Sequence, residues 1–501
     1  GIAFLILFIA GINFTNLTTS LIPLRLKTIN THRVLGCSIY KLQAISLIES
    51  IVICLISYIL ALFIVNDLSY TPIANWVDAD IRLSQYKGLI LLTALIAILT
   101  GCLAGLYPAI RSTSYAPALV LKGSFGLSPK GKKVRVALIG FQYTVSIALI
   151  IVTLFMGLQN HFMTSSEQLG FNKDQVAIVN LTPEIYAKHK PQYIQKLKDY
   201  PGIEDVAFSV YELSKEDDMI DLEYARHEDK DVFFKVFYAS ENFLSVMDIQ
   251  VEEGRDFTRE DLNKAQSDYI INPAAERDFH LHPGDRFNDR TVLGVSKDFR
   301  FNSCRIASSP FVFALNNDIP NPKLVSYIRF NSKTNLQEAV AHVRETLKEI
   351  DPTFPFEISF YNTILNNLYQ KEQTLGKLIS LFGIMAILIS IVGVFGLVLF
   401  ETQYRRKEIG IRKINGATTG QILLMFNKTY IRIVSVCFII SIPIAWMGTQ
   451  QWLENFAYKT PLHLWVFIVA FLIILSVTIG TVTFRNWQAA NENPVNSVKS
   501  E

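Results

Sequence analysis

Seven long apolar runs constrain this chain more than any other feature of its sequence. They cover Ile2–Thr19, Leu42–Val65, Leu89–Ile110, Val134–Leu158, Leu378–Phe400, Ile433–Thr449 and Leu464–Phe484. About 20 helical residues cross a hydrocarbon core of about 30 Å, so these runs suit transmembrane helices. Only 18% of the 501 residues are charged and 50% are hydrophobic, whereas soluble domains are nearer a quarter charged. The predicted fold class is a multi-pass α-helical membrane protein with seven spans.

The Lys and Arg residues between the runs predict the orientation in the membrane. Three basic segments, 24–41, 111–135 and 404–417, contrast with the acidic loop 66–86. Lys and Arg near helix ends mark the cytoplasmic side of a membrane. We therefore expect Gly1 to begin outside, the long polar gap 159–377 to lie outside, and the C-terminus to lie inside.

The polar gap predicts an α+β extracytoplasmic domain. Strand-like runs at Val176–Leu181, Ile203–Ser209 and Phe356–Phe360 alternate with expected helices at 182–200 and 336–350. This order indicates a split βαβ core with a strand-rich insertion at 233–313. Two helix-compatible stretches, 155–169 and 362–377, lead into spans without a proline, and we expect them to form rigid stalks.

The membrane-spanning parts contain an internal repeat. His32–Gly36 lines up with Arg412–Gly416, and Pro117–Lys122 matches Pro494–Lys499 at nearly the same offset. The parallel order of the copies predicts two half-units related by an axis along the membrane normal. By the same repeat, we expect a span and an outer domain to precede Gly1. The expected domains are a first membrane domain (1–122), a basic cytoplasmic linker (123–133), a span (134–158), an outer domain with stalks (159–377) and a second membrane domain (378–501).

The segment Tyr404–Ala417 predicts a short helix at the inner membrane surface. Its five basic residues would cost about 15 kcal/mol at the bilayer centre, so they lie outside the hydrocarbon. Ion pairs at i,i+4 spacing, Glu401 with Arg405 and Glu408 with Arg412, favour a helix. Asn415-Gly416 is typical of a helix end, and Thr418 with Gln421 of a capping box. An apolar stripe of Ile411, Ile414, Thr418 and Ile422 is expected along the other side. A positive-inside anchor without a partner remains the alternative.

Glu49 is the clear acid within a span, and a carboxylate there is costly. One interpretation is a polar group that joins packed helices in the inner leaflet. The sharper hypothesis is an intramembrane ion pair between the copies, with Arg432 or Lys428 as the partner.

Motifs for catalysis are weak. Gly126–Lys133 nearly matches a phosphate loop, but a lysine replaces the hydroxyl residue that binds Mg²⁺. His280 and His282 have no Cys or further His nearby in sequence, so we predict a surface pair and no metal site. Among the five cysteines only Cys304 lies in the outer domain, so no disulfide is expected. The sequence therefore predicts a chain without enzymatic activity that binds no cofactor.

The segment Arg406–Ala417 resembles the signature of FtsX/MacB-type ABC transporter permeases. Stretches of the outer domain at 243–257, 270–276, 292–299 and 368–372 are similar to the MacB-type periplasmic domain. The resemblance implies a cytoplasmic ABC ATPase dimer as partner, with ATP and Mg bound by that ATPase. It implies mechanotransmission to the outer side of the inner membrane, with peptides, lipoproteins, toxins or antibiotics as substrates. Membrane lipids and a periplasmic adaptor are further expected partners, and nucleic acid is not.

The resemblance also implies which residues contact the ATPase. The expected ATPase-coupling helix contains Arg405, Arg406, Lys407, Glu408, Ile409, Gly410, Ile411, Arg412, Lys413 and Gly416. The first copy holds a degenerate version with Arg25, Lys27, His32, Arg33 and Gly36, in which Thr28 replaces the acid. Two other functions stay open: an FtsX-like signal relay that controls an outer enzyme such as a peptidoglycan hydrolase, and an orphan extracytoplasmic receptor.

Overall fold

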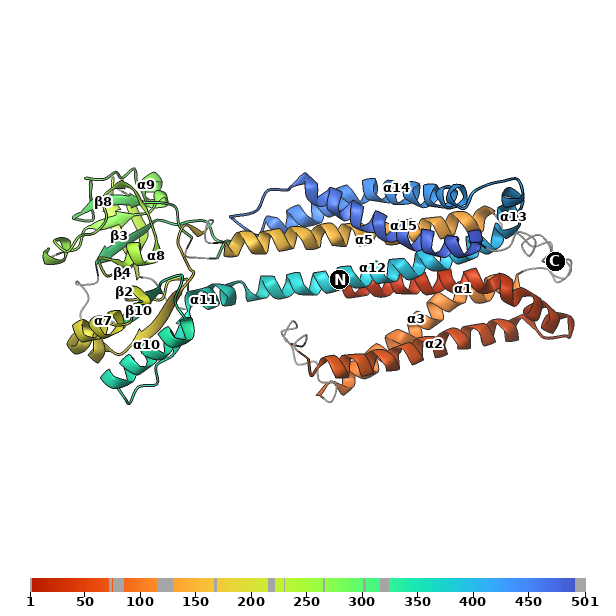
Figure 1. The fold of residues 1–501 in the computed structure, drawn as a ribbon, viewed down its shortest axis with the longest axis horizontal. Coiled ribbons are helices and arrows are strands. Elements are labelled where there is room, and N and C mark those ends of the chain that lie inside the picture. The colour runs from red at the N-terminus through yellow and green to blue at the C-terminus, as the bar shows by residue number, and fades with distance from the viewer. Residues whose placement is uncertain are drawn as a thin grey trace. The chain divides into compact units, whose positions relative to one another are not determined.

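The computed structural model describes residues 2–71, 74, 85–114, 129–165, 169–214, 221–228, 230–264, 266–300, 303–315 and 324–491. The chain divides into two compact units (Figure 1). The helical unit comprises 1–157, 374–451 and 461–501, and the sheet unit comprises 158–373 and 452–460. Most of the acidic loop 66–86 and of the basic linker lies outside the described residues.

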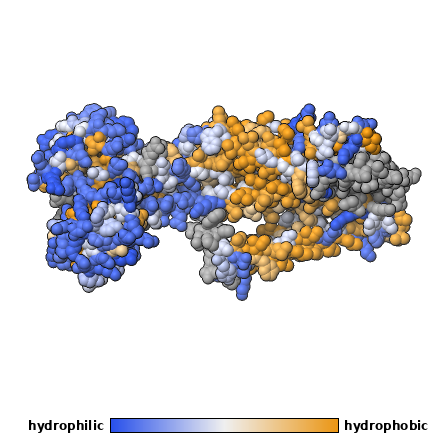
Figure 2. Space-filling view, viewed as in Figure 1, coloured by the Kyte–Doolittle hydropathy of each residue, from blue (hydrophilic) through white to orange (hydrophobic). Residues whose placement is uncertain are grey.

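The helical unit contains seven long helices. They are α1 (Ile2–Val34), α2 (Ile39–Leu68), α3 (Lys87–Thr113), α5 (Pro129–Thr164), α12 (Gln370–Tyr404), α14 (Thr419–Leu453) and α15 (Leu464–Asn491), with the short α13 (Arg406–Ile414) between α12 and α14. Among the described residues, seven helices are long and apolar enough to cross a membrane, which confirms the seven expected spans. Hydrophobic residues cover much of this unit in Figure 2, whereas hydrophilic residues dominate the visible face of the sheet unit.

The two copies meet where α1 runs parallel to α12. The Asn13 amide donates to the Ile389 carbonyl at 2.7 Å, and a Cβ on Gly393 would lie 2.5 Å from Asn13 Oδ1. One turn further along both helices, Gly396 faces Leu17. The residue numbers rise together, so both helices end at the same membrane face. Asn13 and Gly393 are also equivalent in the repeat, as expected for an axis along the membrane normal.

Helix α5 packs against the second copy. The Thr478 hydroxyl donates to the Tyr143 hydroxyl at 3.0 Å, and the Ser146 and Ser390 hydroxyls are 3.0 Å apart. Phe155 meets Phe467 edge to face with ring centroids 5.7 Å apart. Small and hydroxyl-bearing residues permit this close helix packing within a membrane.

The sheet unit contains a mixed sheet of eleven strands. They are β1 (Val176–Leu181), β2 (Ile203–Ser209), β3 (Asp221–His227), β4 (Lys230–Ala239), β5 (Val251–Gly254), β6 (Tyr269–Ile271), β7 (Arg286–Phe287), β8 (Arg290–Ser296), β9 (Phe311–Leu315), β10 (Leu324–Phe330) and β11 (Ile358–Phe360). Their order is β11-β1-β10-β2-β4-β9-β6-β8-β5, with β3 on β4 and β7 on β8. Strand β10 separates β1 from β2, and β1 separates β10 from β11. The expected split βαβ core is therefore confirmed, and the strands inserted between β2 and β10 run from β3 to β9.

Short helices complete the sheet unit. They are the π-helical turn η3 (Ile185–His189), α7 (Lys190–Lys198), α8 (Phe243–Met247), the 3₁₀ turn η4 (Asp261–Asn263), α9 (Pro273–Phe279), α10 (Leu336–Ile350) and α11 (Tyr361–Leu368). Helices α7 and α10 pack on the β1–β10–β2 part of the sheet, where Tyr193, Leu197, Val343 and Leu347 are fully buried. An aromatic cluster around Phe237, Phe243 and Phe313 fills a second core.

Four expected elements differ in detail. The helix expected at 182–200 divides into η3 and α7, because Pro191 near the start of α7 cannot continue a preceding helix. The expected strand Phe356–Phe360 is shorter and begins at Ile358. The stalk expected at 362–377 is interrupted at Tyr369, between α11 and α12. The helix α5 also begins at Pro129, inside the expected linker.

Candidate functional site

Helix α13 is held between two long helices by local contacts that the sequence predicts. Arg405 pairs with Glu401 at 3.0 Å, and Arg412 pairs with Glu408 at 2.7 Å, both at i,i+4 spacing. Gly416 has a φ of +87°, the left-handed conformation that commonly ends a helix. The next helix begins with the expected capping box: the Gln421 N–H donates to Thr418 Oγ1, and the Thr418 N–H donates to Gln421 Oε1.

The exposed face of α13 carries two large apolar side chains. Ile409 is buried, whereas Ile411 and Ile414 are 50% and 64% exposed. The expected stripe is therefore wrong in part: Ile422 is buried, but Ile411 and Ile414 point away from the unit. Residues 409 and 411 lie about 200° apart around a helix, so one faces the unit while the other faces outward. The side chains of Arg406 and Lys407 lie outside the described residues. Exposed isoleucines beside a fixed ion pair suit a protein interface.

The first copy repeats the turn but not the separate helix. Gly36 has a φ of +90°, and the Cys37 N–H donates to the His32 carbonyl at 3.0 Å. In the second copy the Ala417 N–H donates to the Arg412 carbonyl at 2.9 Å, which is the same bond at the equivalent position. Helix α1, however, continues without a break to Val34. The degenerate segment is therefore the end of a transmembrane helix, and the Lys27 side chain is outside the described residues.

Two basic side chains of the first copy, Arg25 and Arg33, bind groups within that copy. Arg33 donates to the Thr113 carbonyl at 3.1 Å. Both oxygens of Glu49 accept bonds from Arg25 at 2.8 Å. The hypothesis of an ion pair between Glu49 and Arg432 is therefore corrected: the partner is Arg25 on the neighbouring helix. Arg25 and Glu49 lie at nearly equal distances along the chain from the turn at Gly36, a hairpin signal that the sequence already contains.

A second site, which we call the stalk junction, lies within the sheet unit. It joins the end of α5, the start of α12, the segment 303–308 and the α14–α15 loop 452–460. Met163, Cys304, Tyr369 and Phe456 form its buried core. Gln159 of α5, itself fully buried, donates to the Tyr458 carbonyl at 3.0 Å and accepts from the Thr460 N–H at 2.8 Å.

Cations and aromatic rings fix the rim of the stalk junction. Arg305 contacts Glu372 at 2.7 Å, and the Arg300 guanidinium lies 4.1 Å from the Tyr458 ring centroid. The Tyr458 N–H donates to the Cys304 carbonyl at 3.1 Å. Burial raises the pKa of the Cys304 thiol, which therefore stays protonated at neutral pH. The sequence does not reveal this site, because its parts are distant along the chain.

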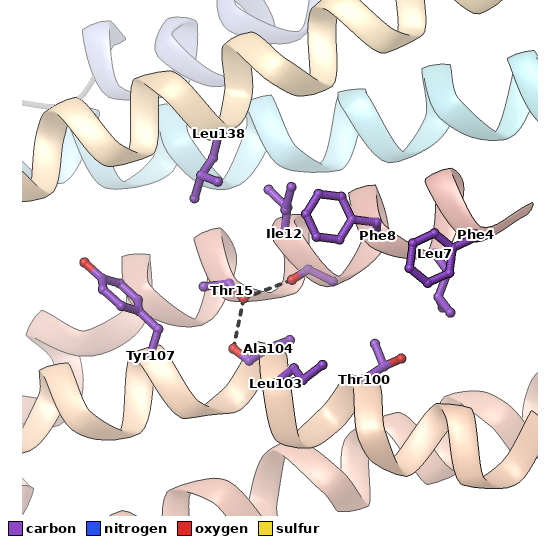
Figure 3. A pocket seen from close by; sticks show the side chains of 11 residues that line it. Phe4, Leu7, Phe8, Ile12, Thr15, Thr100, Leu103, Ala104, Tyr107 and Leu138 are labelled. Carbon is purple, nitrogen blue, oxygen red and sulfur yellow. Dashed lines mark hydrogen bonds between the residues drawn. The ribbon is translucent and has the colours of Figure 1, made fainter. Parts of the chain in front are cut away.

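An apolar groove of about 360 Å³ lies between α1, α3 and Leu138 of α5 (Figure 3). Phe4, Phe8, Leu103 and Tyr107 contribute most of its bulk. The Thr15 hydroxyl lies within hydrogen-bond distance of the Gly11 and Ala104 carbonyls, at 3.0 and 2.9 Å, and can donate to either. The Thr100 hydroxyl donates to the Ile96 carbonyl at 2.8 Å. The groove therefore suits an apolar chain rather than a polar solute.

His282 has acidic neighbours that its sequence position does not reveal. Glu253, Glu276 and His282 offer ligand atoms within 4.8 Å of one another, and His282 Nδ1 lies 3.5 Å from Glu276. His280 instead ends α9 with a φ of 54°. The histidine pair is thus not a joint site, and all five cysteines are free. The carboxylates of this cluster are exposed or partly exposed at the surface.

The comparisons with known proteins identify the two membrane repeats and the broader relatives. The family described as FtsX-like permease C-terminal matches residues 1–117 and 380–494. Macrolide export ATP-binding/permease protein MacB from Aggregatibacter actinomycetemcomitans is 25% identical over 212 residues, covering 40% of this chain and 32% of the relative. The Neisseria gonorrhoeae MacB is 25% identical over 223 residues, covering 42% and 34%. The chain thus spans about a third of the length of these relatives.

Solved structures give a weaker likeness. The periplasmic region of MacB from Actinobacillus actinomycetemcomitans has a TM-score of 0.30 at 15% identity, covering 40% of this chain and 94% of that chain. The extracellular domain of YknZ, a noncanonic ABC-type transporter from Gram-positive bacteria, has a TM-score of 0.28 at 17% identity, covering 37% and 99%.

The described residues form a multi-pass helical membrane protein with two parallel helical repeats and a separate α+β domain. Both repeats match the FtsX-like permease family, and the chain resembles ABC transporter permeases of the FtsX/MacB type.

Proposed function

We propose that this chain is the membrane subunit that carries motion from a cytoplasmic ABC ATPase pair to its outer domain. The ATPase binds ATP and Mg²⁺ and hydrolyses the nucleotide, and this chain contributes no catalytic group. The C-terminus lies on the cytoplasmic side with α13. Mechanotransmission then drives export or extraction on the outer side of the membrane.

The exposed face of α13 is the observation that carries this proposal. Ile411 and Ile414 are exposed next to the Glu408–Arg412 ion pair. A partly apolar patch with a fixed charged pair is a suitable surface for a protein partner. Helix α12 leads from the stalk junction and ends at Tyr404, and Arg405 alone separates it from α13. A push on α13 therefore acts on the end of one continuous helix.

The two copies offer unequal surfaces to an ATPase dimer. Thr28 occupies the place of Glu408, and the first copy has no separate surface helix. The second copy supplies the stronger contact in our proposal, and the first copy the weaker one. Such a chain receives an asymmetric force from two similar ATPase subunits.

The cargo class rests on the relatives rather than on a site. The MacB relatives are named for macrolide export. We propose antimicrobial compounds, peptides or lipoproteins as cargo, handled on the outer side, with a periplasmic adaptor as a further partner.

Affinity purification from native membranes tests the proposal. The tagged wild-type chain is expected to retain an ABC ATPase, identified by mass spectrometry, and Ile411→Asp with Ile414→Asp to lose most of it. The matched control is Leu336→Asp, which places the same charge at a partly exposed apolar position of α10. An exposed isoleucine within a span, such as Ile439, is unsuitable as a control because an aspartate there would disrupt the span. Retention of the ATPase by the α13 double variant would contradict the proposal.

Signal relay to an outer enzyme is the second candidate, because the stalk junction links membrane helices to the outer sheet in either case. Reconstituted complex separates the two functions. Cargo that stimulates ATP hydrolysis supports export, whereas stimulation only by a bound cell-wall hydrolase supports relay.

A further inference from the structure

A second cavity, of about 490 Å³, opens among α1, α2 and α3 near the turn at Gly36. One part of its lining is apolar, with Ile22, Leu42, Ile45 and Pro108. The other part is charged, with Arg25, His32, Lys41 and Glu49. All of these residues belong to or adjoin helices that can span a membrane. The cavity is therefore amphipathic, with its charged part toward the end of the α1–α2 hairpin.

The second copy shows why this cavity exists. Ser46 of the cavity is equivalent to Phe426, whose side chain is buried and lies with its ring centroid 5.8 Å from the Arg405 guanidinium. Tyr430 is fully buried there as well and donates to Glu401 at 3.2 Å, whereas Ser50 takes its place in the first copy. In the second copy the Phe426 ring thus fills the space that Ser46 leaves open in the first, whereas Ser50 is buried and does not line the cavity.

His32 and Lys41 of the cavity lack the bonding partners that the equivalent residues have in the second copy. Arg412 pairs with Glu408, but the equivalent His32 faces the position of Thr28. Gln421 caps the start of α14, whereas its equivalent Lys41 cannot accept that bond. In the part of the chain that the structure describes, the side chains of His32 and Lys41 have neither ion pair nor hydrogen bond.

Arg25 and Glu49 connect two helices that line the cavity. Their two bonds of 2.8 Å connect α1 to α2. In the second copy, by contrast, Arg405 binds Glu401, which lies only four residues earlier in the chain. The pair neutralises itself, so the remaining charge of the lining comes from Lys41 and, when protonated, from His32. A phosphate group next to an apolar tail matches this division of the lining.

We propose that this cavity binds one anionic phospholipid, with the phosphate at Lys41 and His32 and an acyl chain along Ile22 and Ile45. A soluble phosphate ester shares the headgroup chemistry but leaves the apolar lining without a partner. Burial of acyl-chain methylene groups against this lining favours the lipid. The proposal is independent of ATPase binding and of the membrane orientation.

Native mass spectrometry of the purified full chain in a nonionic detergent tests the proposal. Short-chain phosphatidylglycerol is expected to bind at one site and phosphatidylcholine more weakly. Lys41→Gln should weaken phosphatidylglycerol binding about fivefold, the usual effect of one cation near a lipid headgroup. Ser46→Phe, which installs the ring of the second copy, should weaken it at least as much by filling the cavity.

Matched controls separate the cavity from general effects. Lys428→Gln removes an exposed cation from α14, and Ser57→Phe adds a ring at an exposed position of α2. Both are expected to bind the lipid like the wild type. Size-exclusion profiles and thermal unfolding test whether Ser46→Phe is folded. If Ser46→Phe does not fold, Lys41→Gln still tests recognition of the headgroup.

Four outcomes would overturn the proposal. Wild-type affinity in both cavity variants excludes the site, and an equal loss in Lys428→Gln indicates diffuse surface attraction. Equal binding of phosphatidylcholine excludes recognition of the anionic headgroup. Displacement of the lipid by glycerol 3-phosphate or inorganic phosphate at similar concentrations excludes the lipid as the preferred source of the phosphate.

Discussion

Arg25 and Arg405 occupy equivalent places in the two repeats but take their carboxylates from different positions. Glu401 lies one turn before Arg405, which directly follows the end of α12, whereas Glu49 reaches Arg25 from α2. An arginine at this level of a membrane helix needs a partner in either copy, because an unpaired charge near hydrocarbon is costly. The partner's position, unlike the arginine, has changed between the copies.

Exchange of the Arg25–Glu49 charges should preserve the fold. Glu49→Arg is expected to lower the free energy of unfolding by about 1 kcal/mol, since the pair is half-exposed and bidentate. Adding Arg25→Glu should restore most of this loss. Thermal unfolding of the purified chain measures both. Glu49→Arg combined with Arg432→Glu is the control, and rescue by that combination would contradict the assigned pair.

Asp261 makes the sheet unit sensitive to acid. The Arg255 guanidinium, at 2.7 and 2.9 Å, holds the pKa of this buried carboxyl well below its usual range, with further bonds from Thr258. A carboxyl with a lowered pKa in the folded state stabilises the fold above its unfolded pKa of about 4. This stabilisation is lost as the pH falls from about 4 toward the folded pKa.

Asp261→Asn should therefore destabilise the sheet unit at neutral pH by about 2 kcal/mol, since Arg255 keeps partial access to water. The variant should also lose less stability than the wild type between about pH 4 and pH 2. Hydrogen exchange of the full chain across this range measures both effects. Asp278→Asn, which removes an exposed surface pair, is the control. Parallel pH curves for wild type and Asp261→Asn would refute the assignment.

Local signals predict elements well when the contacts that form them are close in sequence. The capping residues Asn335 and Thr418 mark real helix starts, and Gly36 and Gly416 mark real turns. The break at Pro191 can also be predicted from the sequence, because a proline cannot continue a preceding helix. The break at Tyr369 cannot be predicted in this way, since the Tyr369 hydroxyl contacts Cys304, which is far away in the chain.

The two coupling elements should differ in ATPase binding. Glu408→Lys reverses one charge of the α13 ion pair and leaves Arg412 without its partner. Thr28→Lys changes the equivalent place in α1, where no ion pair exists in the described residues. We expect Glu408→Lys to reduce ATPase co-purification several-fold more than Thr28→Lys, as quantified by mass spectrometry. Equal losses would show that the copies contribute equally.

The internal repeat determines where the two basic turns lie in the whole molecule. Sequence comparison alone aligned the two basic turns, and the parallel packing of α1 and α12 brings both to one membrane face. The cavity of the first copy and the filled equivalent of the second could not be predicted, because they depend on which side chains face the space between three helices. The stalk junction likewise joins four segments that carry no common motif.

The stalk junction should be required for coupling but not for ATP hydrolysis. Gln159 is buried and makes two hydrogen bonds to the loop at Tyr458 and Thr460. Gln159→Leu should cost about 2 kcal/mol locally, since the Thr460 N–H loses its acceptor. In the complex with its ATPase, we expect faster hydrogen exchange in residues 452–460 and loss of ATP-dependent changes in the sheet unit. ATP hydrolysis should stay near the wild-type rate, because α13 is unchanged.

His161→Ala, an exposed neighbour on α5, is the control. ATP-dependent changes that persist in Gln159→Leu would show that the force travels by another route.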